Sequence, residues 1–240
     1  MINRILISCI ALAFFASAAL AAEEVAAGAP NLIGKDFAGW KYKNEKASLW
    51  KIVGDVKMSA TNNKELEPSG QPAETPILVN DLKVGQHGTD CYTEKEFGDC
   101  EVHVELMVPK GSNSGVYLMG RYEVQVFDSF GKKKPQTVDL GSIYATHAPD
   151  PENYEPKAPG EWQTFDIVFQ APKFGADGKK TANAKFLSVK LNGKEIQKDI
   201  DTPKPTGSEL SSKEVPTGPL MLQGDHGPVA FKNLRVKETK

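Results

Sequence analysis

The segment EVHVELM, residues Glu101–Met107, alternates polar and apolar side chains almost without a break. A period of two puts successive side chains on opposite faces of an extended chain, so the segment predicts a β-strand with one buried face. Similar alternation recurs at 121–126, 164–169, 186–191 and 229–236, and a short apolar run lies at 220–222. Within 229–236 the apolar positions change parity, which predicts a β-bulge.

Turn-forming residues separate these runs. Asn192-Gly193 lies between two alternating segments and predicts a two-residue hairpin, because both central positions of a type I′ turn need positive φ. Gly111, Gly115 and Gly120 predict a further reversal of the chain. Many short strands with regular turns predict an all-β fold, either an antiparallel sandwich or a barrel.

The first 21 residues predict a secretory signal peptide. Arg4 precedes an apolar run at 5–20, and small residues at Ala19 and Ala21 suit cleavage. The run is shorter than the roughly 20 residues that span a bilayer, although a retained N-terminal anchor is the alternative. We therefore expect an exported protein, periplasmic or extracellular, with no membrane span after cleavage.

Beyond residues 1–21, composition and patterning predict one domain. Residues 22–30 predict a short tether, and 31–238 predict a single domain with surface loops at 59–76, 129–137 and 201–219. The 240 residues carry 29 Lys and Arg against 31 Asp and Glu, a formal charge of −2. This balance argues against nucleic acid as the main partner, because phosphate binding leaves a basic surface.

Removal of residues 1–21 would leave two cysteines, Cys91 and Cys100. An even number of cysteines in an exported protein predicts a disulfide between them. Two separate buried thiols are the alternative. The spacing does not fit a zinc site, in which paired cysteines lie two to four residues apart.

A row of polar residues on one strand is the first candidate site. Arg121, Glu123 and Gln125 share one face of their strand, where they could hydrogen-bond sugar hydroxyls while aromatic rings stack on sugar C–H groups. A solvated outer face with cross-strand charge pairs is the alternative.

Two of the four histidines also suggest sites. His226 lies in the tight loop Asp225-His226-Gly227-Pro228, and a histidine in a loop between rigid strands suits catalysis better than one in a core. An Asp-initiated turn is the alternative. His103 could form a cation site with the acids around it and Glu123 of a neighbouring strand, or could belong to an exposed polar face.

Seven segments, in this order and spacing, resemble the 3-keto-disaccharide hydrolase domain family over about residues 31–238. They read YTEKEFGD (92–99), PKGSNSGVYL (109–118), GRYEVQVFDS (120–129), GSIY (141–144), PGEWQTFDI (159–167), LQGDHG (222–227) and VAFKNLRV (229–236). The resemblance implies a concanavalin A-like jelly-roll sandwich that acts on glycosides whose sugar carries a 3-keto group. Two departures are Met119, where the family often has Arg or Gln, and Gly224, which separates Gln223 from Asp225.

Such a substrate dictates what the site must supply. A 3-keto group acidifies the proton on C2, so a base can remove it and the enolate can expel the group on C1, with water adding later. The paired carboxylates of ordinary glycosidases are not needed. The resemblance implies Glu123 or His226 as the base and Arg121 at the enolate oxygen, with or without a divalent cation. The residues expected to position the sugar are Gln125, Asp128, Tyr144, Trp162 and Gln223.

We therefore expect an exported glycoside-acting enzyme whose ligand is a 3-keto-glycoside or a related sugar. A non-catalytic, lectin-like carbohydrate-binding module that uses the same face is the alternative from another class. A purely structural envelope domain is the third.

Overall fold

The computed structural model describes residues 28–83 and 85–239. The predicted signal peptide at 1–21 and residues 22–27 of the predicted tether lie outside this range. In the described part, no helix has the length and apolar character needed to cross a membrane.

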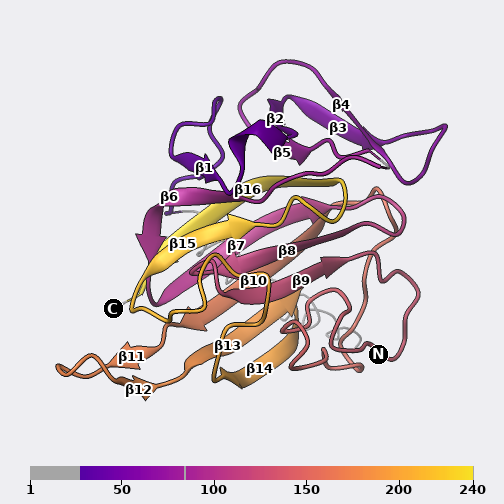
Figure 1. Cartoon of the computed structure of the whole chain (residues 1–240). Helices are drawn as coiled ribbons and strands as arrows, with labels where there is room; N and C mark the ends of the chain where they lie inside the picture. Colours follow the sequence, from indigo (N-terminus) through magenta and orange to yellow (C-terminus); the bar gives the residue numbers. More distant parts are fainter. Residues whose placement is uncertain (1–27, 84, 240) are drawn as a thin grey trace, which may run out of the picture.

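Two antiparallel sheets form a sandwich, which confirms the predicted all-β jelly-roll class (Figure 1). The five-stranded sheet contains, in spatial order, β1 (Trp40–Tyr42), β6 (Cys91–Phe97), β15 (Gly218–Leu222), β8 (Asn113–Leu118) and β9 (Tyr122–Phe127). The seven-stranded sheet contains β14 (Lys194–Thr202), β13 (Ala184–Leu191), β10 (Gln163–Gln170), β7 (Cys100–Met107), β16 (Val229–Glu238), β5 (Ile77–Asn80) and β2 (Trp50–Val53).

Two small hairpins extend from the sandwich at opposite ends in Figure 1. One consists of β3 (Asp55–Met58) and β4 (Leu66–Ser69), and the other of β11 (Lys173–Phe174) and β12 (Lys180–Ala182). A single 3-10 turn, η1 (Glu45–Ala47), is the one helical element of the described residues.

The core lies between the two sheets, and the alternation in the sequence determines which residues enter it. Val102, Val104 and Leu106 of β7 are completely buried, while the polar residues between them face outward. From the facing sheet, Tyr122 and Val124 of β9 enter the same cluster. Each such side chain contributes about 1.5–3 kcal/mol when it is removed from water, so this pattern fixes the strand register.

The predicted turn and bulge are confirmed. Asn192 and Gly193 join β13 to β14 with φ of 51° and 82°, as a type I′ turn requires. Strand β16 shifts register against β7 between Lys232 and Arg235, and Asn233 adopts φ of 50° within this bulge.

The predicted loop at 59–76 is wrong in part, because β4 lies within it and pairs with β3. Leu66 is completely buried against Val56 and Met107, in a second apolar cluster separate from the core between the sheets. A single apolar residue within a polar stretch produces no periodicity, so the pattern could not reveal this strand.

The predicted disulfide is also wrong, since Cys91 and Cys100 are free buried thiols. Cys91 begins β6 in one sheet and Cys100 begins β7 in the other, with all seven residues of β6 running between them. A strand of that length separates its ends by roughly 20 Å, whereas a disulfide needs Cα atoms within about 7 Å. Burial raises the pKa of Cys100 to about 12 and raises that of Cys91 as well.

Both thiols should therefore be unreactive in the folded protein and reactive once it unfolds. Protein produced without residues 1–21, and so without Cys9, should gain no adduct from N-ethylmaleimide in native buffer, because the burial of both thiols hinders access and thiolate formation. In guanidinium without reductant it should gain two adducts by mass spectrometry. A requirement for reductant before labelling would contradict the structure and restore the disulfide.

Candidate functional site

The outer face of the five-stranded sheet carries a buried polar cluster. Glu123 and Gln125 of β9 share this face, as predicted, because Tyr122 and Val124 point into the core. The face is not solvated, however: Glu123 and Gln125 are each only 2% exposed, and the neighbouring Tyr117 of β8 is completely buried. Other segments of the chain therefore cover these strands on both sides.

Glu123 is held by contacts on three sides. Tyr117 lies directly opposite it in the register and donates its hydroxyl to Glu123 Oε2 at 2.7 Å. The backbone N–H of Glu123 donates to Thr206 Oγ1 at 3.0 Å. Its carboxyl lies over Gly115, where a Cβ atom would come within 2.2 Å of Oε1. The missing side chain of Gly115 therefore makes the space that the carboxyl occupies.

The environment of Glu123 favours its neutral form. Burial raises the pKa of Glu123 to about 8, the hydrogen bond from Tyr117 opposes that rise, and the charges of Asp90 and Asp225 add to it. Glu123 is consequently protonated in most molecules at pH 7, and the carboxyl can serve as a proton donor. Burial and Glu123 also raise the pKa of Tyr117 far above its ordinary value.

The loop that carries His226 is the second part of the site. Asp225 Oδ1 accepts a hydrogen bond from His226 Nδ1, and this pairing leaves Nε2 as the nitrogen available to a ligand. The imidazole is about half exposed. It lines a cavity of about 240 Å³, the His226 cavity, whose walls also include Lys110, Ser112 and Gln86.

Both sheets anchor this loop. Asn80 at the end of β5 donates its side-chain amide to the carbonyls of Gly224 and Gly227, each at 2.9 Å. Asp90, beside the start of β6, accepts the N–H of Gly224 at 2.9 Å. A Cβ at Gly224 would lie 2.2 Å from the carbonyl oxygen of Thr89, so only glycine allows this approach. Gly224, a departure from the family pattern, is thus required by the local packing.

Three of the residues predicted to position a sugar lie near Glu123. Gln125 donates to the carbonyl of Val138 at 3.2 Å, and Tyr144 donates its N–H to the carbonyl of Glu123 at 3.2 Å. Gln223 donates its N–H to the carbonyl of Gly115 at 3.0 Å. Strand pairing on both sides of Glu123 therefore brings Gln125, Tyr144 and Gln223 together.

Arg121 makes contacts that are structural. It donates Nε to the carbonyl of Lys213 at 2.8 Å and a terminal guanidinium nitrogen to the carbonyl of Met119 at 2.7 Å. These bonds tie the long connection at 203–217 to the turn between β8 and β9. Contact between Arg121 and an enolate oxygen remains a prediction. In this structure the guanidinium donates to two backbone carbonyls.

Trp162 and Asp128 lie apart from Glu123. Trp162 packs against the second apolar cluster, with Lys232 Nζ 4.2 Å from the centre of its ring. A role of Trp162 in positioning the sugar stays a prediction. Asp128 follows β9, and its carboxylate accepts the N–H of Gly111 at 2.9 Å.

The cation site considered for His103 and Glu123 is not formed. His103 lies on β7 of the seven-stranded sheet, whereas Glu123 lies on the other sheet, and His103 Nδ1 pairs with Asp166 at 2.7 Å. Across residues 28–83 and 85–239, no group of three or more His, Cys, Asp or Glu side chains is placed to hold a metal ion. In the described residues, the acids around His103 and Glu123 therefore do not assemble into a ligand set for a divalent cation.

Sequence reasoning missed Asp90 and Asn80 as parts of the site. Asp90 is 3% exposed, ion-paired with Lys43 at 2.9 Å and close enough to influence Glu123. Asn80 is completely buried. Neither stands in a recognisable motif, because its partners lie more than 130 residues away along the chain.

A model of the 3-keto-alpha-glucoside-1,2-lyase-like domain family matches residues 28–237. The chain belongs to this family. The description of this family and the first structure below indicate a carbohydrate-active protein. No curated protein sequence matches the chain.

The chain is similar to solved structures from Parabacteroides distasonis ATCC 8503. One candidate glycosyl hydrolase shares 26% identity with a TM-score of 0.62, and the match covers 88% of this chain and 84% of that one. A second shares 20% identity with a TM-score of 0.54, covering 88% and 98%, and supports the fold alone.

Replacement of Glu123 by Gln should change how stability depends on pH. The folded-state pKa of about 8 lies above the ordinary value of 4.5, so the folded protein binds more protons than the unfolded chain between these values. Stability of the native protein should therefore fall by about 1 kcal/mol per pH unit as pH rises through this window, and Glu123→Gln should flatten the slope. Denaturant unfolding at pH 5.5, 6.5 and 7.5 measures how the free energy of unfolding changes with pH. The exposed Glu94→Gln provides the control, and equal slopes in all three proteins would contradict the assignment.

Arg121→Met should destabilise the protein by about 2–3 kcal/mol, because two carbonyls would lose a charged donor. The effect should be local as well, with faster amide hydrogen exchange across 203–217 than in the native protein. Denaturant unfolding and exchange mass spectrometry measure both. Unchanged exchange in that segment would show that Arg121 does not hold it.

Proposed function

We propose that this chain cleaves 3-keto-glycosides by elimination across C1 and C2 of the oxidised sugar. The observation that carries the proposal is the placement of two unlike groups in a member of this family: an exposed His226 oriented by Asp225, and a buried Glu123 that stays protonated. A base and a proton donor on different side chains are what such a reaction requires.

His226 is the proposed base, because its imidazole is half exposed and faces a cavity. Nε2 would remove the proton from C2, which the neighbouring C3 ketone acidifies, and Asp225 would stabilise the imidazolium that forms. The electron pair of the enolate then re-forms the C3 carbonyl, creates a C1–C2 double bond and breaks the bond from C1 to the leaving oxygen. Later addition of water across C1 and C2 gives net hydrolysis.

Glu123 is the proposed proton donor to the leaving oxygen. Its carboxyl is neutral at pH 7, and Tyr117 fixes one oxygen while Gly115 leaves room beside the other. Because the side chain is only 2% exposed, the residues that cover it must move when a substrate binds.

That burial also favours a second candidate function, a carbohydrate-binding module without chemistry. A binding module has no need for an accessible carboxyl, and the buried cluster would then serve only to hold the sheet and the His226 loop. The two functions differ in whether the protein turns over a 3-keto-glycoside at all, and in whether that turnover depends on His226.

Mature protein incubated with 4-nitrophenyl 3-keto-α-glucoside should release nitrophenol, and His226→Asn should lower kcat at least about 100-fold through loss of the base. Glu123→Gln should lower kcat about 10-fold or more for methyl 3-keto-α-glucoside, whose leaving alkoxide needs a proton, and less for the nitrophenyl glycoside. Deuterium at C2 should slow the native reaction, because the C2–H bond breaks before or as the leaving group departs.

His147→Asn is the matched control, since His147 is an exposed loop histidine outside the site. It should keep native turnover. The proposal fails if unoxidised 4-nitrophenyl α-glucoside reacts equally fast, or if His226→Asn and His147→Asn behave alike. Saturable sugar binding without any turnover would favour the binding module.

A further inference from the structure

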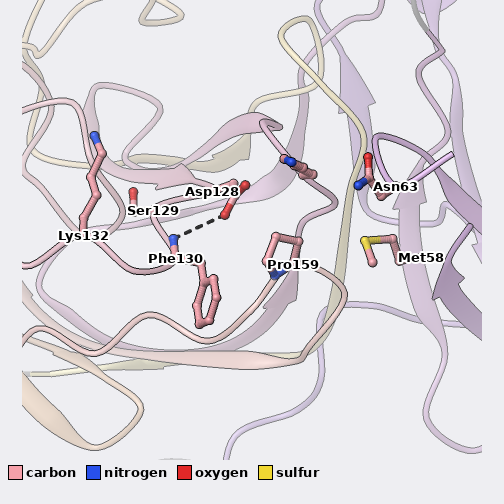
Figure 2. A pocket seen from close by; sticks show the side chains of 8 residues that line it. Met58, Asn63, Asp128, Ser129, Phe130, Lys132 and Pro159 are labelled. Carbon is pink, nitrogen blue, oxygen red and sulfur yellow. Dashed lines mark hydrogen bonds between the residues drawn. The ribbon is translucent and has the colours of Figure 1, made fainter.

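A second hollow, of about 400 Å³, adjoins the proposed site. We call it the Phe130 groove, and the residues that line it are Met58, Asn63, Lys110, Asp128, Ser129, Phe130, Lys132 and Pro159. Figure 2 shows Asp128, Phe130 and Lys132 on one side of Pro159, with Asn63 and Met58 on the other. Its walls therefore come from the segment after β9 and from the connection between β3 and β4.

The lining combines an apolar platform with polar edges. Phe130 is 60% exposed, which makes it one of two large apolar side chains that face solvent in the described residues. Asn63, Lys110 and Asp128 add an amide, an ammonium and a carboxylate to the lining. A pyranose ring has the matching chemistry, because its C–H face stacks on an aromatic ring while its hydroxyls reach donors and acceptors.

The groove is held in shape by hydrogen bonds of the surrounding backbone. Asp128 accepts the N–H of Gly111 at 2.9 Å and the N–H of Phe130 at 3.3 Å, which fixes the segment that presents the ring. Lys110 donates its N–H to the carbonyl of Asn63 at 2.8 Å and so joins the two walls. The exposed ring thus stands on an ordered support.

Lys110 connects the Phe130 groove to the proposed site, because it lines both this groove and the His226 cavity. Lys132, by contrast, is engaged by the buried Asp139. A ligand longer than one sugar that reaches His226 would therefore extend past Lys110 towards Phe130.

We propose that the Phe130 groove binds the sugar unit beyond the cleaved bond, and that the preferred substrate is a 3-keto oligosaccharide. A glycoside with a small leaving group would leave the groove empty. The position of the cleaved bond rests on the proposed function, whereas binding of a sugar in the groove does not. A hollow with one exposed ring is too small for a stable protein interface, which buries about 800 Å² on each partner.

The kinetic test compares two substrates: maltotriose oxidised at C3 of its non-reducing unit, and methyl 3-keto-α-glucoside, whose methoxy leaving group is too small to reach the groove. Phe130→Ala should lower kcat/KM for the trisaccharide about tenfold, equivalent to about 1.4 kcal/mol, and leave the methyl glycoside within about twofold. Asn63→Ala should act in the same direction. Equal loss with both substrates, or no loss with either, would overturn the proposal.

Val138→Ala is the matched control, because Val138 is the other exposed large apolar residue and lies outside the groove. It should leave both substrates unchanged. An effect as large as that of Phe130→Ala would show that loss of any exposed apolar side chain is sufficient, and would overturn the assignment.

A binding test separates this proposal from the proposed function. Unoxidised maltotriose and cellotriose are titrated into the native protein and into Phe130→Ala, with amide chemical shifts as the readout. At least one should shift amides at 63, 110 and 128–130, and Phe130→Ala should weaken that binding at least fivefold. Such binding without turnover of any 3-keto substrate would overturn the proposed function and support the groove as a sugar site. If neither sugar binds, the proposal that the Phe130 groove is a sugar site is overturned.

Discussion

Strands β8 and β9 of the five-stranded sheet are buried on both faces, and this constraint determines the structure of the candidate site. A polar group without water must find a partner within the protein, since an unpaired buried group costs several kcal/mol. Glu123 therefore bonds to Tyr117 and Gln125 to a backbone carbonyl, while Asp90 holds the loop of His226. The same burial that demands these partners keeps Glu123 protonated, so the packing of the sheet and the chemistry of the site have one cause.

Local features of the fold could be predicted from the sequence. The alternation at β7, the Asn192-Gly193 turn and the bulge in β16 depend on neighbouring residues, and each was predicted correctly. The shared face of Glu123 and Gln125 belongs to the same class, because strand parity is local. The burial of these two residues could not be predicted locally, because it depends on distant segments. Tyr144 donates its N–H to the carbonyl of Glu123, and Thr206 accepts the N–H of Glu123.

The predicted disulfide was wrong, and two candidate site residues make contacts that the sequence pattern could not reveal. Cys91 and Cys100 are close in sequence, yet one strand carries them to opposite ends and into different sheets. Trp162 stands in a recognised segment but turns to the second apolar cluster. Arg121 shares strand parity with Glu123, but its guanidinium bonds the carbonyl of Met119 beside it and that of Lys213 in a connection some 80 residues later. Only the tertiary fold decides these three cases.

The anchoring of the His226 loop has an evolutionary consequence. Its hydrogen bonds run to Asn80 in one sheet and to Asp90 beside the other, and Gly224 fits only because the chain at Thr89 is close. The four residues Asp225 to Pro228 therefore cannot keep their conformation when transferred alone to another protein. A sandwich that acquired them alone would gain an aspartate and a histidine but not their fixed orientation. In this architecture new specificity should arise more readily by change in the adjoining segments, such as those around Phe130, than by relocation of the histidine.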